Sequence, residues 1–234
     1  MNRSIDDEKL ARAHARLLDE IQADARETEF WTGRNKFSAA VMAAMKKVPR
    51  HEFVLSGDKE VAYINRPLPI GHGQTISQPY IVALMTDILN LKKTDKVLEI
   101  GTGCGYQSAV LAEVAGQVFS IEVVPDLATA ARQKLKGLGY DNIEVRHGDG
   151  FQGWPEEAPF DAILVTAAPE GVPPALADQL KPGGRMIIPI GTPYSSQILT
   201  LVIKQVDGTV KTFNTLPVAF VPMVQGRGEG RQTN

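Results

Sequence analysis

The residues best suited to chemistry in this chain are an acid and three alternating glycines, Glu99-x-Gly101-x-Gly103-x-Gly105. The acid lies within the apolar stretch 96–100, which is typical of a buried parallel strand, and the glycines predict a turn that leaves this strand. The next residues, 106–115, are rich in Ala, Leu and Val and predict a helix. Strand, glycine turn and helix together predict a nucleotide-binding unit, with the N-terminus of the helix facing the ligand.

The residue after the last glycine indicates which nucleotide binds. A dinucleotide fingerprint, G-x-G-x-x-G/A, requires Gly or Ala at position 106, where this chain has the much larger Tyr106. The acid two residues before the first glycine instead resembles the first motif of S-adenosylmethionine (SAM) methyltransferases with a Rossmann-like fold. We therefore expect this turn to bind SAM through Glu99, Gly101, Thr102, Gly103, Gly105 and Tyr106. The alternative is a plain strand, turn and helix that binds no ligand.

Acids also follow the next two predicted strands. Glu122 comes directly after residues 117–121, where an acid can accept hydrogen bonds from both hydroxyls of a ribose. Asp149 follows residues 142–146, the place where many SAM enzymes read the adenine amino group. We expect both acids, with the neighbouring Val123 and Gly150, to border the nucleotide. The alternative is that they are ordinary loop acids.

Upstream of the glycine turn, residues 63–80 read YINRPLPIGHGQTISQPY. Their prolines and glycines predict a structured loop rather than a strand or a helix. This loop offers short polar side chains at Gln74, Thr75, Ser77 and Gln78, and such loops often carry function. The alternative is that Thr75 or Ser77 only caps a helix that begins at Pro79. His72, between two glycines, is expected to be exposed.

Two other candidates have a structural interpretation. Cys104 could be a nucleophile, but no His lies nearby in the sequence, and a small side chain that fills the glycine turn is the simpler interpretation. Because it is the only cysteine, the chain has no internal disulfide and no multi-cysteine metal site, and we expect no bound metal. His51, beside Arg50, is interpreted as a hydrogen-bonded structural group.

The remaining pattern alternates between helices and strands. It predicts an α/β, doubly wound Rossmann-like sheet, mostly parallel, with an antiparallel hairpin at its end and an N-terminal helical extension. The ligand should lie beyond the carboxyl ends of the central strands. Helices are expected at 4–26 (with Ser4 and Asp7 as a capping-box-like start), 38–48, 80–91 (amphipathic), 126–137 and 173–180. Further strands are expected at 160–166, after the turn KPGG, and at 197–204 and 209–213 around the turn Asp207-Gly208.

Composition and length set the remaining bounds. We expect a single domain over 1–234, divided into helices and active-site loop (1–91), SAM-binding core (92–195), and C-terminal strands with a substrate-site tail (196–234). The net charge of −2 gives no basic surface for sequence-independent nucleic-acid binding. The N-terminus has no apolar core of a signal peptide, and no apolar stretch is long enough to span a bilayer. The sequence predicts a cytoplasmic monomer without membrane or nucleic-acid partners, whose tail loses its periodicity after Met223.

Taken together, residues 38–223 resemble the bacterial type of protein-L-isoaspartate O-methyltransferase. The segments that carry the resemblance are, in order, VPRHEFV, PLPIGHGQTISQP, VLEIGTGCGYQ, GDG, FDAILVTAA, LKPGGRMIIPIG and FVPM. The segment 73–79 is the specific signal, since the glycine turn marks only the SAM superfamily. The resemblance implies that Ser77 is the active-site residue, that Thr75, Ile76 and Gln78 lie beside SAM, and that Val221 and Pro222 line the peptide site. Cys104 departs from the Ser of many relatives, and the first thirty or so residues carry no assignable motif.

The implied reaction transfers a methyl group from SAM to the free carboxylate of an L-isoaspartyl residue in a damaged protein or peptide. A carboxylate of pKa about 4 is already ionised at neutral pH, so no general base is required. The chain must place the reacting atoms in line and keep water away, and we expect Ser77 to orient the carboxylate with a hydrogen bond. Rival interpretations are a SAM methyltransferase for a small molecule or nucleic acid, a binding-only subunit, and a dehydrogenase. The net charge and the lack of an N-P-P-Y-like tetrapeptide disfavour nucleic acid, and Tyr106 disfavours the dehydrogenase.

Overall fold

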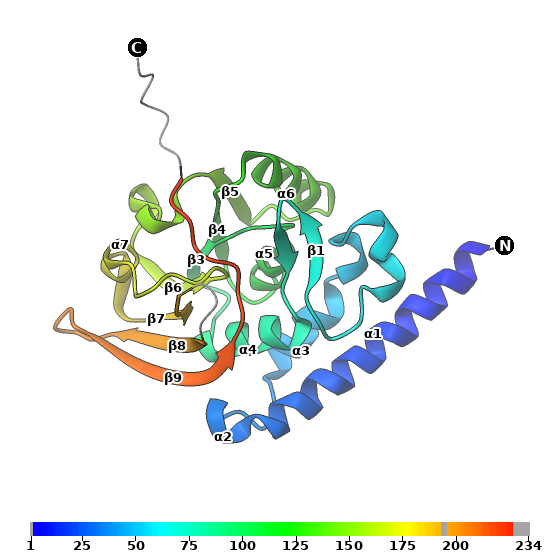
Figure 1. The fold of residues 1–234 in the computed structure, drawn as a ribbon, viewed down its shortest axis with the longest axis horizontal. Helices are drawn as coiled ribbons and strands as arrows, with labels where there is room; N and C mark the ends of the chain where they lie inside the picture. Colours follow the sequence, from blue (N-terminus) through cyan, green and yellow to red (C-terminus); the bar gives the residue numbers. More distant parts are fainter. Residues whose placement is uncertain (1, 193–195, 227–234) are drawn as a thin grey trace, which may run out of the picture.

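The computed structural model describes residues 2–192 and 196–226, with side chains from residue 7 onward. Its centre is a seven-stranded sheet in the order β5-β4-β3-β6-β7-β8-β9 (Figure 1). From β5 to β7 the neighbouring strands run parallel, whereas β8 and β9 run antiparallel. The predicted mostly parallel sheet with an antiparallel end is confirmed. The strands are β3 (Lys96–Ile100), β4 (Gln117–Glu122), β5 (Ile143–His147), β6 (Phe160–Val165), β7 (Leu180–Ile190), β8 (Gln197–Lys204) and β9 (Val210–Val218).

Side chains of the central strands alternate between the two faces of the sheet. In β3, Val97 packs into the cluster under the N-terminal helices, while Leu98 and Ile100 pack into a second cluster on the other face. Because both faces are covered, these strands are apolar at nearly every position. Two polar exceptions, Glu99 and Ser120, stand opposite each other in the β3–β4 register. This buried polar pair lies in the core beneath the glycine turn.

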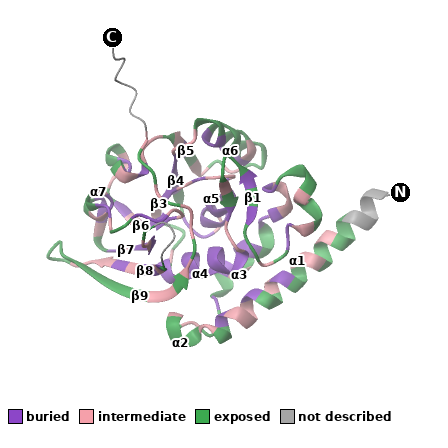
Figure 2. Cartoon of the chain, viewed as in Figure 1, coloured by how far each residue is buried: buried purple, intermediate pink, exposed green. Residues whose placement is uncertain are grey.

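The helices are α1 (Asn2–Glu27), α2 (Glu29–Thr32), α3 (Ala39–Lys47), α4 (Pro79–Leu89), α5 (Tyr106–Ala112), α6 (Pro125–Gly137) and α7 (Pro174–Asp178), with short 3-10 turns η1 (Arg50–Glu52), η2 (Ser56–Val61), η3 (Gly150–Gln152) and η4 (Pro155–Glu157). The predicted N-terminal helical extension is present as α1, which buries Leu17, Ile21 and Ala25 along one side (Figure 2). The prediction that Ser4 caps this helix concerns a side chain outside the described residues.

The prediction of an amphipathic helix at 80–91 was wrong in one respect. Every residue of α4 is buried (Figure 2), because α1 and α3 pack on it from one side and β6, β7 and α5 from the other. A helix that is buried on all sides is apolar on all sides and not amphipathic. Its polar residues Thr86 and Asp87 form hydrogen bonds within the structure. Thr86 donates to the Val82 carbonyl, and Asp87 accepts from the Ser38 backbone N–H.

The prediction of a structured loop, rather than a strand or a helix, at 63–80 was also wrong in part. Residues 68–76 form an antiparallel hairpin of β1 (Leu68–Gly71) and β2 (Gln74–Ile76), separate from the main sheet. Its turn places His72 at φ 52° and Gly73 at φ 70°, a pair of left-handed residues typical of hairpin turns. The prolines suggested a loop because they interrupt a central strand, but an edge hairpin tolerates them. His72 at the tip is exposed, as expected.

Two boundaries near the C-terminus differ from expectation. The segment KPGG is not a turn before the strand but an irregularity within β7, which already pairs with Phe160 at Leu180. The turn Asp207-Gly208 joins β8 to β9 as predicted, and β9 continues to Val218, farther than the predicted residue 213. Residues 227–234 lie outside the described residues. In the part of the chain that the structure describes, no helix is long and apolar enough to cross a membrane.

Candidate active site

A cavity of about 660 Å³ opens at the carboxyl ends of β3, β4 and β6. This volume is within the range of small-molecule sites, and the place is the one expected for a doubly wound sheet. The walls come from the end of α1, the hairpin with the start of α4, the glycine turn, and the segment 216–224. Of the predicted site residues, those that line it are Thr75, Ile76, Ser77, Gln78, Gly101, Thr102, Gly103, Tyr106, Glu122, Val123, Gly150, Val221 and Pro222.

The glycine turn is held in shape by a residue from the neighbouring strand. Gly101 has φ +94°, and a Cβ there would come within 2.2 Å of Thr166 Oγ1. Thr166 Oγ1 in turn donates to the Gly101 carbonyl at 2.7 Å, and the Gly101 N–H donates to the Ile121 carbonyl at 2.8 Å. Only glycine fits this position, because both the backbone conformation and the space exclude a side chain. The turn therefore presents its backbone at the wall of the cavity.

Glu122 is the acid that reaches the cavity. Its side chain is 5% exposed, and its two oxygens accept hydrogen bonds from the backbone N–H groups of Gly103 at 2.7 Å and Val124 at 3.0 Å. A carboxylate has about four acceptor sites, so these two bonds leave acceptor capacity toward the cavity. The position agrees with the predicted contact to ribose hydroxyls, which stays a prediction.

Glu99 does not line the cavity. It is fully buried on the face of β3 that packs against α5, where Ser120 Oγ donates to Oε2 at 2.6 Å and Ser108 Oγ donates to the same oxygen. Burial raises the pKa of Glu99 to about 8, and Oε1 has no partner among the described residues. Ser120 Oγ also lies 2.6 Å from Thr102 Oγ1, so this network supports the glycine turn from below.

Asp149 is also outside the cavity wall. Its side chain accepts a hydrogen bond from the Phe151 N–H at 2.9 Å and so caps the short turn η3. The backbone of Gly226 packs beside it, while the next residue, Gly150, forms part of the wall. The structure thus brings Glu122, Val123 and Gly150 to the site, and places Glu99 and Asp149 behind it. Gly105, which precedes α5, is likewise behind the wall.

Ser77 lies between β2 and α4 and lines the same cavity. It is half-buried, and no described residue forms a hydrogen bond with its hydroxyl. The residue that precedes α4 is Gln78, and neither Ser77 nor Thr75 forms a capping hydrogen bond with this helix in the described residues. The alternative interpretation, in which Ser77 or Thr75 serves only as a helix cap, is therefore wrong. The Ser77 hydroxyl is available to a ligand in the cavity.

The start of α4 is fixed by residues that the sequence did not single out. Asn65 Oδ1 accepts from the Tyr80 N–H at 3.0 Å, and Asn65 Nδ2 donates to Asp24 Oδ2 at 2.7 Å. Thr28 Oγ1 and the Tyr80 hydroxyl lie 2.5 Å apart. Asp24, Glu27 and Thr28 also line the cavity. No local motif marks these residues, because the contacts join segments 15 to 52 residues apart.

The segment after β9 closes the remaining side. Gln197 holds Phe220 by two hydrogen bonds, at 3.0 Å to its carbonyl and 2.6 Å from its N–H. Ala168 accepts from the Met223 N–H at 2.9 Å and donates to the Val221 carbonyl at 2.8 Å. These bonds place Val221 and Pro222 at the cavity, and their expected contact with the peptide stays a prediction.

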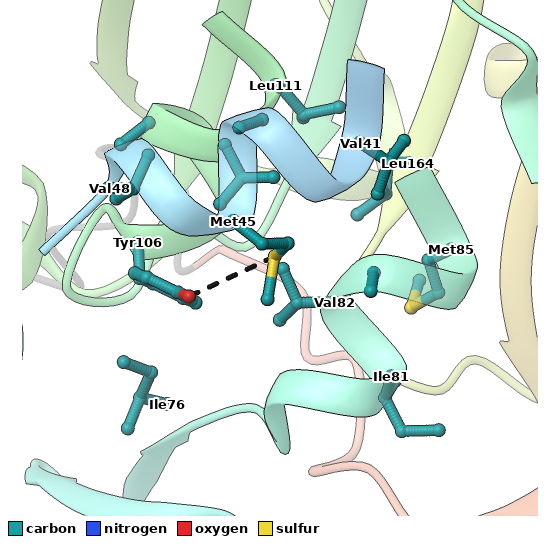
Figure 3. Packing of buried hydrophobic residues seen from close by; sticks show 14 of the residues in the cluster. Val41, Met45, Val48, Ile76, Ile81, Val82, Met85, Tyr106, Leu111 and Leu164 are labelled. Atoms are coloured by element: carbon teal, nitrogen blue, oxygen red, sulfur yellow. Dashed lines mark hydrogen bonds between the residues drawn. The ribbon is translucent and has the colours of Figure 1, made fainter. Parts of the chain in front are cut away.

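Of the remaining sequence candidates, Cys104 and Tyr106 line the cavity and His51 does not. Burial raises the pKa of the Cys104 thiol to about 11, which keeps it protonated and unsuited to act as a nucleophile. His51 Nδ1 lies 2.7 Å from the Tyr63 hydroxyl and does not line the cavity. The Tyr106 ring is buried, with the guanidinium of Arg50 4.9 Å from its centroid and its hydroxyl directed at Met45 (Figure 3). Among the described residues, no group of His, Cys, Asp and Glu could hold a metal ion.

Comparison with known sequences points to one family of proteins. The family model for protein-L-isoaspartate(D-aspartate) O-methyltransferases matches residues 29–228. Protein-L-isoaspartate O-methyltransferase 2 of Syntrophobacter fumaroxidans is 54% identical over 94% of this chain and 89% of its own length. The protein of the same name from Polaromonas sp. is 57% identical over 90% of this chain and 100% of its own.

Solved structures agree with the sequences. One protein-L-isoaspartate O-methyltransferase superposes with a TM-score of 0.79 at 30% identity, covering 92% of this chain and 67% of the other. A second, described as a protein-L-isoaspartate O-methyltransferase from Plasmodium falciparum in complex with S-adenosyl-L-homocysteine, gives a TM-score of 0.72 at 27% identity. The match covers 90% of this chain and 98% of that one.

Proposed function

The chain belongs to the protein-L-isoaspartate(D-aspartate) O-methyltransferase family, and from this premise we propose which residues of its cavity bind SAM and which bind the isoaspartyl peptide. The protein transfers the methyl group of SAM to the free carboxylate of L-isoaspartyl residues in damaged proteins and peptides. The products are a methyl ester and S-adenosylhomocysteine. The proposal concerns which residues hold each partner and how they promote the transfer.

The end of the cavity at the glycine turn fits SAM. Glu122 keeps acceptor capacity toward the cavity, and Gly101 is a position where a side chain would collide with Thr166. We assign the binding of SAM to Glu122, Val123, Gly150 and the turn residues Gly101, Thr102 and Gly103, with Thr75, Ile76 and Gln78 across the cavity. Glu99, Gly105 and Asp149 act indirectly in this proposal, by shaping the turns that carry the wall.

The other end of the cavity is assigned to the isoaspartyl peptide. Ser77 donates a hydrogen bond from Oγ to the substrate carboxylate and so orients one oxygen toward the methyl group. Val221 and Pro222 form the facing wall, and their backbone is fixed through Ala168. This assignment is supported by the free hydroxyl of Ser77 in a wall that the hairpin and the tail segment form together.

The residues of the cavity suit a reaction between opposite charges. Bound SAM supplies an electrophilic methyl group on a positively charged sulfur, and the substrate carboxylate is already ionised at neutral pH. No proton has to be removed, and among the described lining residues there is no His to remove one. The apolar walls, which include Ile76, Ile100 and Phe220, exclude water while charge is lost on the way to the ester. The chain then promotes methyl transfer by placing the substrate carboxylate, through Ser77, in line with the methyl group of SAM.

We also propose, as the sequence predicted, that the chain acts as a monomer. A molar mass near 25.4 kDa in light scattering at working concentration supports this, and a dimer mass contradicts it. A cytoplasmic location stays a prediction of the sequence.

The observation that carries the proposal is that Glu122, at the end of β4, and Ser77, between β2 and α4, line one cavity. The test incubates the purified protein with methyl-labelled SAM and a matched peptide pair, one isoaspartyl and one aspartyl. Base-labile volatile label on the isoaspartyl peptide alone is the expected result, because a methyl ester is hydrolysed by base. Label on neither peptide, with SAM still bound, would contradict the assignment of the substrate end.

A further inference from the structure

The charged side chains that line the cavity in the described part of the chain are all acidic. They are Asp24, Glu27 and Glu122, and none of the described lining residues is Lys, Arg or His. Glu122 belongs to the SAM end. The other two acids come from the last turn of α1 and have no part in the function assigned so far.

Asp24 and Glu27 lie at the far end of the cavity from Glu122. Glu122 ends β4, whereas α2, which follows these acids directly, contacts β9 (Figure 1). In the sheet, β4 and β9 lie on opposite sides of β3 and β6. The acids therefore flank the end where Ser77 and the tail segment receive the peptide. They also precede residue 29, where the family match begins.

The two acids are not neutralised by the protein. Asp24 accepts one hydrogen bond from Asn65 but no described cation, and burial together with the nearby Glu27 raises its pKa. Glu27 is exposed and forms no ion pair within the described part of the chain. Two neighbouring carboxylates without a cation repel each other, and a cationic ligand relieves this repulsion.

We infer that Asp24 and Glu27 determine substrate specificity: they favour isoaspartyl peptides with a Lys or Arg beside the isoaspartyl residue and disfavour those with Asp or Glu there. The inference rests on the proposed assignment of this end to the peptide. The isoaspartyl carboxylate itself is held at Ser77, so only flanking side chains meet the acids. The effect acts on peptide binding and leaves the chemical step unchanged.

The test compares isoaspartyl peptides that differ only in one flanking residue, Lys, Ala or Glu, placed before or after the isoaspartyl position. Glu27→Gln removes one charge at an exposed site, and Glu27→Lys reverses it. Glu20→Gln is the matched control, because it makes the same charge change at an exposed site two turns earlier in α1 that does not line the cavity. Asp24 is left intact, since its bond to Asn65 also fixes the start of α4.

The expected result is a kcat/KM ratio of Lys to Glu peptide that falls about threefold in Glu27→Gln and about tenfold in Glu27→Lys, as for a partly exposed charge pair. The ratio should stay unchanged in Glu20→Gln, and the effect should shrink at high salt. Turnover of the Ala peptide reports the proposed function separately. An unchanged ratio in Glu27→Lys, with the Ala peptide still methylated, overturns the inference. A weakened SAM affinity in Glu27→Gln also overturns it, because the acids would then belong to the cofactor end.

Discussion

The two ends of the cavity are built in different ways. At the SAM end, most of the wall comes from one short stretch, residues 100–104 with Tyr106, joined by the ends of the strands β4 and β6. At the peptide end, the wall combines the end of α1, Ser77 with the start of α4, and the segment after β9, and hydrogen bonds of Asn65 join the first two. The first end depends on backbone conformation within a short motif, and the second depends on hydrogen bonds between distant segments. Substitutions at the two ends should therefore affect different quantities.

The largest effect is expected for Gly101→Ala. The new Cβ would meet Thr166 Oγ1 at 2.2 Å, and Ala is strained at φ +94°. We expect the free energy of unfolding to fall by about 2–4 kcal/mol, from clash and strain combined. SAM affinity, measured by calorimetry, should fall more than about a hundredfold, since distortion of the turn removes several contacts at once.

Gly57→Ala is the control for this change, because nothing lies within 4 Å of a Cβ there and its φ is not left-handed. It should change stability by less than about 0.5 kcal/mol. A Gly101→Ala protein that binds SAM as tightly as the parent would contradict the assignment of the turn to the SAM end.

A smaller effect, on the other end, is expected for Asn65→Ala. The change leaves the Tyr80 N–H and the Asp24 carboxylate without their partner. We expect a loss of about 1–3 kcal/mol in the free energy of unfolding. The KM for an isoaspartyl peptide should rise several-fold while SAM affinity changes little, because the start of α4 positions Ser77.

Asn35→Ala, at an exposed site, serves as the control for that variant and should leave both constants unchanged. If Asn65→Ala weakens SAM binding as much as it raises the peptide KM, the two ends are not separable and the comparison fails.

A third effect, on stability alone, concerns Glu99, under the glycine turn. Its pKa is about 8 in the folded protein and 4.5 in the unfolded chain, so unfolding releases a proton between these values. The free energy of unfolding should therefore fall as pH rises through this window, by up to about 1.4 kcal/mol per pH unit. Glu99→Gln retains the acceptor for Ser108 and Ser120 but does not titrate.

Denaturation midpoints of the parent and of Glu99→Gln, measured between pH 5 and 8.5, check this. The denaturation midpoint of Glu99→Gln should increase relative to that of the parent as the pH rises. Parallel pH profiles would show that Glu99 is ionised throughout and would contradict the buried, protonated state.

The same contrast explains how far the sequence predicts the molecule. The order of strands and helices follows from local periodicity and from turns such as Asp207-Gly208, and the structure confirms most of it. Gly101 and Glu122 were found because the fold puts strand ends at one edge. Glu99 and Asp149 were expected at the same edge, but side-chain direction and a local cap turned them away. That direction depends on which face of the strand a residue occupies.

The peptide end shows the limit of such reasoning. The resemblance identified Ser77, but nothing local marked Asp24 and Glu27 as part of the cavity or Asn65 as the support of α4. Their contribution depends on how α1 packs against α4, and packing between distant segments leaves no spacing pattern in the chain. The hairpin was missed for a related reason, since its prolines and its His72-Gly73 turn resemble a loop unless the pairing partner is known.

The separation of the two ends is tested most directly by Ser77→Ala. SAM affinity by calorimetry and kcat on an isoaspartyl peptide are measured on the same preparation, with Ser56→Ala, an exposed serine, as the control. We predict that kcat falls about ten- to a hundredfold, the value of a hydrogen bond to a charged group, while SAM affinity stays within about twofold of the parent. An equal loss of SAM affinity, or an unchanged kcat, would contradict the proposed role of Ser77 and with it the division of the cavity.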